Sequence, residues 1–163
     1  MFLYHGSTVE IKDIDLALSK PNKDFGKGFY LSDNFEQAYE MASYKADILG
    51  TKPCVTKFEF DENLLKDRSL RVLSFNEYSK DWADFVFQNR SQEKQDSYHG
   101  YDIVIGPIAN DRVGAQIRHY IEGDISFDTF LERLKYMKGI TFQYFFGTEK
   151  AVQMLINKGL CYE

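Results

Sequence analysis

Gly26-Lys27-Gly28-Phe29-Tyr30-Leu31-Ser32 is the stretch of the sequence that says most about the fold. Two glycines here precede a short aromatic and aliphatic run, which indicates a tight turn leading into a β-strand over residues 29–32. A Rossmann fold needs the opposite order, because its glycine fingerprint follows a strand and opens a helix. The sequence therefore argues against a dinucleotide-binding Rossmann fold.

A helix is expected directly after this strand. Asp33 and Glu36 have the spacing of a capping box, and Gly50 followed by Pro53 ends the helical pattern. Between them, apolar residues recur at the spacing of one helix face, at Phe35, Ala38, Tyr39, Ala42, Ala46 and Leu49.

The rest of the chain mixes strands and helices without strict βαβ alternation. Apolar runs indicate strands over residues 1–5, 54–60, 70–73, 102–106 and 140–146. Residues 91–98 are polar and are expected to form a loop. A helix is predicted to begin at Ser74 with Glu77, with a buried face of Tyr78, Trp82, Phe85 and Val86. Two more helices are predicted near residues 113–121 and 127–137. A last helix is predicted to run from Thr148 through Ile156 and to end at Gly159. This order of elements indicates an α+β fold.

The composition suits one folded domain spanning residues 1–163. The chain is 44% hydrophobic and 16% aromatic, which is enough to fill a core and excludes general disorder. No repeat, low-complexity segment or linker divides it. The formal net charge of -5 argues against a protein that coats nucleic acid through long-range attraction.

The sequence carries no sign of a membrane, export or metal-binding function. No apolar stretch is long enough to cross a bilayer, and the N-terminus lacks the pattern of a signal peptide. Cys54 and Cys161 lack metal-ligand spacing and are expected to be free thiols in a reducing cytoplasm. Asp24-Phe25-Gly26 matches the metal-binding tripeptide of protein kinases, but the partner motifs are missing, so we interpret it as coincidence. We therefore expect a cytoplasmic protein with no metal and no membrane partner.

Three short segments place polar groups where they can reach a ligand. His5 ends the first strand and is followed by Gly6, which leaves room beside the backbone. The imidazole of His5 can donate to a sugar hydroxyl. Tyr30 can stack on a flat heterocycle. Gln143 is an amide inside an aromatic strand, where it can hydrogen-bond a ribose. Each has a purely structural alternative: a satisfied strand-end histidine, a core aromatic and an outward-facing polar position.

Together these segments resemble the ADP-ribosyltransferases of the diphtheria-toxin and poly-ADP-ribose-polymerase type. Tyr4-His5-Gly6-Ser7 is similar to the family's first-strand motif, in which His is followed by Gly and then Ser or Thr. Residues 26–32 resemble its second motif, Gly-x-Gly-x-Tyr-(Phe/Leu)-(Ala/Ser). Gln143-Tyr144-Phe145 lies where the family has a Glu in a late strand, so the pattern is His-Tyr-Gln. Residues 24–32 and 101–111 most resemble an uncharacterised bacterial branch, and the resemblance covers most of the chain.

The resemblance implies a split, strongly bent β-sheet with flanking helices and NAD bound as co-substrate in the cleft. His5 would hydrogen-bond the adenosine ribose, and Tyr30 would stack on the nicotinamide. Gly6 would present backbone to the nicotinamide amide, and Ser7 would support its ribose. The implied NAD contacts are His5, Gly6, Ser7, Gly28, Tyr30 and Ser32. The implied activity is that of a glycosyltransferase (pentosyltransferase), which transfers ADP-ribose, releases nicotinamide and passes through an oxocarbenium-like state without a metal.

Gln143 departs from the family pattern and changes the expected chemistry. An amide cannot carry a negative charge or act as a base, so it stabilises the developing cation less than a carboxylate does. We therefore expect transfer of a single ADP-ribose, and expect glutamate at this position to keep or raise nicotinamide release. Asp111 is the candidate helper carboxylate in the catalytic group, with Glu149 behind it. The alternative role for Asp111 is a helix cap.

Two other functions stay open from the sequence. The first is a module of the same fold that binds NAD or ADP-ribose but has lost turnover at Gln143. The second is NAD-dependent removal of an RNA 2′-phosphate, which would need clustered arginines where Lys20, Lys23 and Lys27 form only a small basic strip. For the transferase, the acceptor is a protein or a nucleic acid. A small bacterial enzyme of this type is a candidate toxin paired with an antitoxin.

Overall fold

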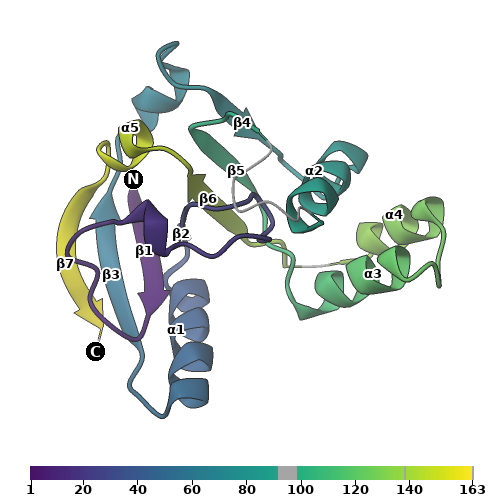
Figure 1. Cartoon of the computed structure of the whole chain (residues 1–163), viewed down its shortest axis with the longest axis horizontal. Helices are drawn as coiled ribbons and strands as arrows, with labels where there is room; N and C mark the ends of the chain where they lie inside the picture. The colour runs from purple at the N-terminus through teal and green to yellow at the C-terminus, as the bar shows by residue number, and fades with distance from the viewer. Residues whose placement is uncertain (92–98, 138, 163) are drawn as a thin grey trace.

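Two β-sheets form the frame of the molecule (Figure 1). The computed structural model describes residues 1–91, 99–137 and 139–162, apart from the side chain of Asp111. One sheet is antiparallel and has the order β1 (Phe2–Ser7), β3 (Cys54–Glu59) and β7 (Ile156–Tyr162). The other has the order β2 (Phe29–Leu31), β6 (Phe142–Phe146), β5 (Ile103–Pro107) and β4 (Val72–Ser74), in which only β4 and β5 pair in parallel. This mixture of sheets and helices confirms the predicted α+β class.

The two sheets meet where β1 passes the end of β2. The amide of Tyr4 donates to the carbonyl oxygen of Ser32 at 2.7 Å, and the amide of Ser32 donates back at 2.9 Å, which forms an isolated antiparallel bridge. This bridge brings His5 on β1 beside Tyr30 on β2. On the other edge of β2, Tyr30 is the register partner of Phe145 on β6.

Helix α1 (Phe35–Leu49) covers the β1–β3 side and confirms the helix predicted there. Its buried face consists of Ala38, Ala42 and Ala46, and these small side chains let the helix approach β1 closely. Gly50 ends it in the left-handed conformation, with φ of 64°. The predicted cap was wrong, because Asn34 rather than Asp33 accepts the hydrogen bond from the first turn.

Helix α2 (Lys80–Arg90) buries Trp82, Phe85 and Val86, as the spacing predicted. It begins after its cap Ser79, so the predicted start at Ser74 was wrong. Ser74 instead pairs with Ile105 at the end of β4. The strand pairing is a long-range contact, and it outweighs the local capping pattern.

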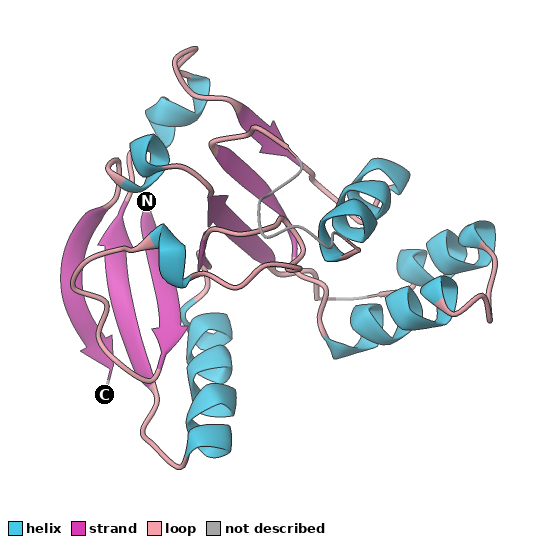
Figure 2. Cartoon of the chain, viewed as in Figure 1, coloured by secondary structure: helices cyan, strands magenta, loops and turns pink. Residues whose placement is uncertain are grey.

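Helices α3 (Asp111–Ile121) and α4 (Phe127–Lys135) form an arm that extends away from the sheets (Figures 1 and 2). Asn110 caps α3, so Asp111 is its first residue and not its cap. The arm is attached through a buried cluster shared with α2, which includes Trp82, Val113, Ile117, Phe130 and Leu134. A second buried cluster lies between the two sheets around Leu3, Phe58, Ile103 and Phe146.

The C-terminal part of the chain differs most from the prediction. Thr148 does cap a helix, but α5 (Glu149–Val152) has only one turn, and residues from Ile156 onward form β7 instead of continuing it. β7 is mostly exposed and pairs with β3 through two register shifts. Gly159 has a φ of 84° within this strand, whereas the sequence suggested that it closes a helix.

Among the described residues, the remaining short elements are two 3₁₀ turns, Leu16–Leu18 and Glu62–Lys66. Over the described residues, none of the helices combines the length and the apolar character needed to span a bilayer.

Candidate functional site

His5 is held at the junction of the two sheets in one tautomer. Its Nδ1 lies 2.7 Å from the carbonyl oxygen of Tyr30, and its ring stacks on Phe29. Because a carbonyl oxygen can only accept, Nδ1 carries the proton and Nε2 keeps its lone pair. Burial, followed by the charge of Lys45, lowers the pKa of His5 from 6.5 to about 4, so the ring is neutral at pH 7. The sequence suggested a donor to a sugar hydroxyl, but the neutral ring presents Nε2 as an acceptor.

Tyr30 is held by contacts of its hydroxyl and of its ring. Its hydroxyl donates to the carbonyl oxygen of Gly26 at 2.6 Å and accepts from the amide of Phe25 at 3.1 Å. Its ring contacts Phe145 edge-on, and Lys23 Nζ stands 4.9 Å from the ring centroid. Burial raises the pKa of the phenol well above its usual value. Tyr30 therefore offers a neutral, rigidly held ring and no free hydroxyl proton.

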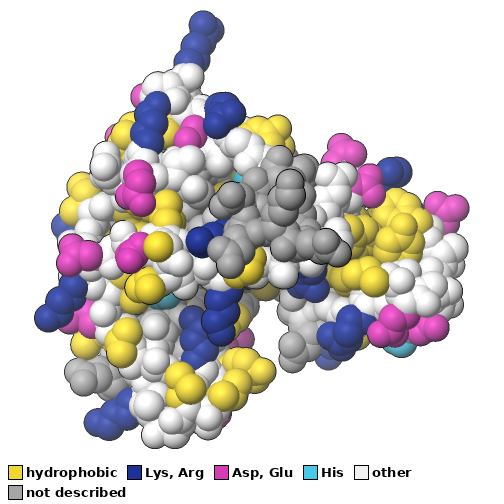
Figure 3. Space-filling model, in the orientation of Figure 1, with side chains coloured by type: hydrophobic (Ala, Val, Ile, Leu, Met, Phe, Trp, Pro, Cys, Tyr) yellow, Lys and Arg dark blue, Asp and Glu magenta, His cyan; other side chains and the backbone are white. Residues whose placement is uncertain are grey.

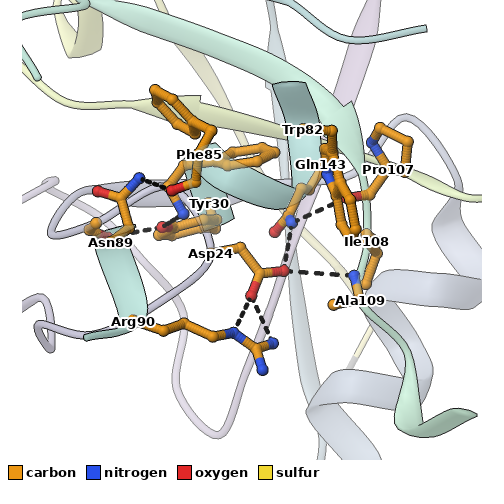
Figure 4. A network of polar contacts seen from close by, with 12 residues as sticks. Asp24, Tyr30, Trp82, Phe85, Asn89, Arg90, Pro107, Ile108, Ala109 and Gln143 are labelled. Carbon is orange, nitrogen blue, oxygen red and sulfur yellow. Dashed lines mark hydrogen bonds and ion pairs between the residues drawn. The ribbon is translucent and has the colours of Figure 1, made fainter. Parts of the chain in front are cut away.

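The amide of Gln143 is oriented by two acceptors, as Figure 4 shows. Its Nε2 donates to Asp24 Oδ2 at 2.9 Å and lies 3.4 Å from the carbonyl oxygen of Pro107. Neither neighbour can donate, so the NH₂ group must face them. Oε1 is consequently directed away from this pair, where it can accept a hydrogen bond from a ligand.

Asp24 is the centre of this network (Figure 4), a role that the local sequence pattern did not indicate. Its Oδ1 accepts from Arg90 Nε at 2.8 Å and Nη2 at 2.6 Å. Its Oδ2 accepts from Gln143 and from the amide of Ala109 at 3.3 Å. Asp24 is only 9% exposed, so an ion pair supports this carboxylate in a largely dry setting. The tripeptide dismissed as a coincidental kinase motif thus holds the group that orients Gln143.

This contact changes what a glutamate would do in place of Gln143. The sequence alone suggested that glutamate would keep or raise nicotinamide release. In the structure, its carboxylate would lie beside the Asp24 carboxylate, where the amide now donates at 2.9 Å. Two carboxylates at this separation cannot both stay ionised without a large penalty. An amide suits this position because Asp24 needs a donor there.

The glycine and serine positions of the two motifs are largely occupied by contacts within the protein. The carbonyl oxygen of Gly6 accepts from Lys45 Nζ at 2.6 Å. A Cβ at Gly28 would lie 2.2 Å from the Phe145 ring, which explains the glycine by packing alone. The hydroxyl of the buried Ser32 accepts from the amide of Asn34. Ser7 lies at the end of β1, opposite Cys54.

Of the two candidate helper carboxylates, only Glu149 has a described side chain. Asp111 begins α3, and its side chain lies outside the described part of the structure. Glu149 is exposed at the start of α5, beyond the end of β6 that is remote from Gln143. The carboxylate beside Gln143 is Asp24.

One group of possible metal ligands occurs among the described residues, remote in sequence from these contacts. His119, Glu122 and Asp124 offer ligand atoms within 4.8 Å of one another at the end of α3. All three are exposed, and His119 Nδ1 already contacts Asp124 at 3.0 Å. Exposed clusters of this kind are common on protein surfaces and assign no metal site.

Comparison with known families shows which family the chain matches. A family model described as "Protein of unknown function (DUF3990)" matches residues 1–156. This range includes His5, Tyr30, Asp24 and Gln143. No curated protein matches the chain.

Proposed function

We propose that this chain, which belongs to the DUF3990 family, is a mono-ADP-ribosyltransferase that uses NAD and releases nicotinamide. The observation that carries the proposal is a chain of contacts that links three residues distant in the sequence. His5 contacts the backbone of Tyr30, while Tyr30 and Gln143 both bind the segment 24–26. The bridge between β1 and β2 is proposed to correspond to the split in the sheet of the family that the sequence resembles.

The hydrogen-bonding groups of the site match those of a dinucleotide. Ribose hydroxyls can donate to two acceptors, His5 Nε2 and Gln143 Oε1, whose orientation follows from their other partners. The ring of Tyr30 provides a flat surface for the nicotinamide. These contacts fix both ends of the substrate, which lowers the entropic part of the barrier.

In the proposed reaction, the bond between ribose C1′ and nicotinamide breaks, and its electron pair leaves with nicotinamide. The nucleophilic atom of the acceptor then bonds to C1′, and its proton passes to solvent. Gln143 Oε1 would stabilise the positive charge that develops on the ribose through a hydrogen bond to its hydroxyl. Asp24 holds the NH₂ group of the Gln143 side chain, so the dipole of this amide is already oriented before the reaction begins.

A module that binds NAD or ADP-ribose without turnover is the second candidate. The hydrogen bonding of Asp24 favours this candidate. The two carboxylate oxygens of Asp24 already accept four hydrogen bonds from Arg90, Gln143 and Ala109. This carboxylate is committed to the fold, so it does not replace the glutamate of the family pattern at the ribose.

The test is incubation of the purified protein with NAD labelled on its adenosine part, with and without bacterial lysate. The transferase predicts free nicotinamide and label on protein or on nucleic acid, and nuclease and protease treatment separate these acceptors. EDTA should have no effect. Binding without nicotinamide release would favour the binding module, and loss of activity with EDTA would mean another reaction class.

A matched pair of variants ties the activity to the site. Gln143→Ala should lose most of the nicotinamide release, while Gln153→Ala, at an exposed position, should keep it. Equal activity in all three proteins would remove Gln143 from the mechanism. Growth arrest on expression, relieved by Gln143→Ala, is the expected result if the enzyme is a toxin.

A further inference from the structure

Two lysines contact the groups that form the proposed site. Lys45, on α1, donates from Nζ to the carbonyl oxygen of Gly6 at 2.6 Å. Lys23 Nζ stands over the ring of Tyr30, at 4.9 Å from its centroid. Both ammonium groups are close enough to His5 to disfavour its protonation. Both ammonium groups therefore lie near the contact between His5 and Tyr30.

Lys20 adds a third positive charge to this group, because it acts on both Lys23 and Lys45. Figure 3 shows Lys and Arg side chains gathered on this face, beside the hollow between α1 and the arm formed by α3 and α4. The sequence had suggested only a small exposed strip of Lys20, Lys23 and Lys27. Lys45 was not part of that strip, and its helix brings it there.

The positive charges of these lysines repel one another. None of the ion pairs between described residues includes Lys20, Lys23 or Lys45. Burial, followed by Lys23 and Lys20, lowers the pKa of Lys45 to about 8. Burial, followed by Lys20, lowers the pKa of Lys23, whose ammonium lies against Tyr30 although the side chain as a whole is exposed. An anion bound among them would remove this repulsion.

We propose that Lys23 and Lys45, with Lys20 at the rim, bind the diphosphate of a dinucleotide. This inference rests on the proposed function, in which His5 contacts the adenosine ribose and Tyr30 the nicotinamide. The diphosphate joins those two halves, so it must pass the contact between His5 and Tyr30. Lys45 can keep its bond to Gly6 and still reach a phosphate oxygen, because an ammonium group has three donors.

The experiment measures the binding of inorganic pyrophosphate to the whole chain by calorimetry. Lys23→Met and Lys45→Met remove the charge and keep the length of the side chain. Each should weaken pyrophosphate and NAD binding by about ten- to a hundredfold, the usual loss of one hydrogen bond between charged groups. Lys135→Met on α4 makes the same change at an exposed position and should stay within about twofold of the wild type. Added NaCl should weaken pyrophosphate binding in the wild type.

The outcomes separate this inference from the proposed function. Pyrophosphate binding that depends on Lys23 and Lys45, without nicotinamide release, supports the anion site and contradicts the transferase. Nicotinamide release with unchanged affinity for NAD in both lysine variants supports the transferase and overturns the anion site. The anion site is also overturned if the two lysine variants bind an oligonucleotide more weakly than the wild type but bind pyrophosphate equally well. If Lys45→Met does not fold, the result with Lys23→Met, at an exposed position, decides the test.

Discussion

Replacing Asp24 with asparagine is expected to lower both the stability of the fold and the turnover of NAD. The new amide must turn its NH₂ group either toward Arg90 or toward Gln143. Facing the guanidinium is the worse choice, because a donor would meet a buried cation. The NH₂ group should therefore face Gln143, whose own amide must turn over to accept from it. Oε1 would then leave the position from which it can contact a ribose.

The size of the stability loss follows from the burial of the ion pair. Removing one partner of a buried pair costs about 3–5 kcal/mol. The Arg90 side chain keeps 28% exposure, so water can recover part of this, and we expect about 2–3 kcal/mol. At roughly 2–4 °C per kcal/mol for a chain of this size, Tm should fall by about 5–10 °C. Nicotinamide release should fall by about tenfold to a thousandfold.

The assay is nicotinamide release at a temperature where every variant is folded, together with NAD affinity by calorimetry. Asp102→Asn is the matched control, because Asp102 is also buried, at 7% exposure. Its carboxylate accepts from the amide of Arg71 and the hydroxyl of Thr148, away from Gln143. This variant should lose stability but keep turnover and NAD affinity.

A double variant tests the orientation argument directly. Asp24→Asn combined with Gln143→Glu exchanges donor and acceptor, so the new amide can donate to the new carboxylate. It should recover part of the stability and turnover that Asp24→Asn loses. The reasoning is refuted if Asp24→Asn releases nicotinamide at the wild-type rate while Gln143→Ala does not. It is also refuted if Asp102→Asn loses as much turnover as Asp24→Asn.

The remaining predictions concern Gln143, His5 and two glycines. Gln143→Glu alone should lower both Tm and nicotinamide release, because the new carboxylate lies beside Asp24; a rise in release would contradict this contact. The lowered pKa of His5 means that the unfolded state binds its proton first, so stability should fall as the pH drops from about 6.5 toward 4, by on the order of 3 kcal/mol. Urea unfolding at pH 7 and pH 4.5 measures this, and the same pH dependence in His5→Gln would assign the loss to other groups. Gly6→Ala should lower Tm, because its Cβ would lie 1.9 Å from the carbonyl oxygen of Ala38 in α1. Gly114→Ala has no atom within 4 Å of its Cβ and should raise the stability of the fold by up to about 1 kcal/mol. Equal Tm values for Gly6→Ala and the wild type would mean that α1 can shift.

Local patterns predicted the elements whose formation depends on neighbours in the sequence. The spacing of Ala38, Ala42 and Ala46 marked α1, and Gly50 marked its end, because both signals act within a few turns of chain. The same kind of signal misplaced the start of α2 at Ser74. It also extended α5 into residues that form β7. In both cases a strand pairing with a distant part of the chain overrides the local preference.

The candidate site shows the same limit for side chains. His5, Tyr30 and Gln143 were found from short motifs, since each stands in a recognisable local setting. Arg90 and Lys45 carried no local signal, and Asp24 carried a misleading one. Their partners lie far away: Asp24 bonds Arg90 across 66 residues and Gln143 across 119. No motif of contiguous residues can encode such a contact.

By itself, the sequence determined the α+β class, most helices and strands, and the types of side chain at the candidate site. These follow from periodicity, turn residues and composition, which act over a few residues. Only the tertiary structure decided the hydrogen-bonding roles. His5 presents an acceptor because its Nδ1–H donates to the carbonyl oxygen of Tyr30, and Gln143 presents Oε1 because Asp24 accepts from its NH₂ group. Both roles depend on which group lies on the other side of the side chain, and that is settled by the packing of distant segments.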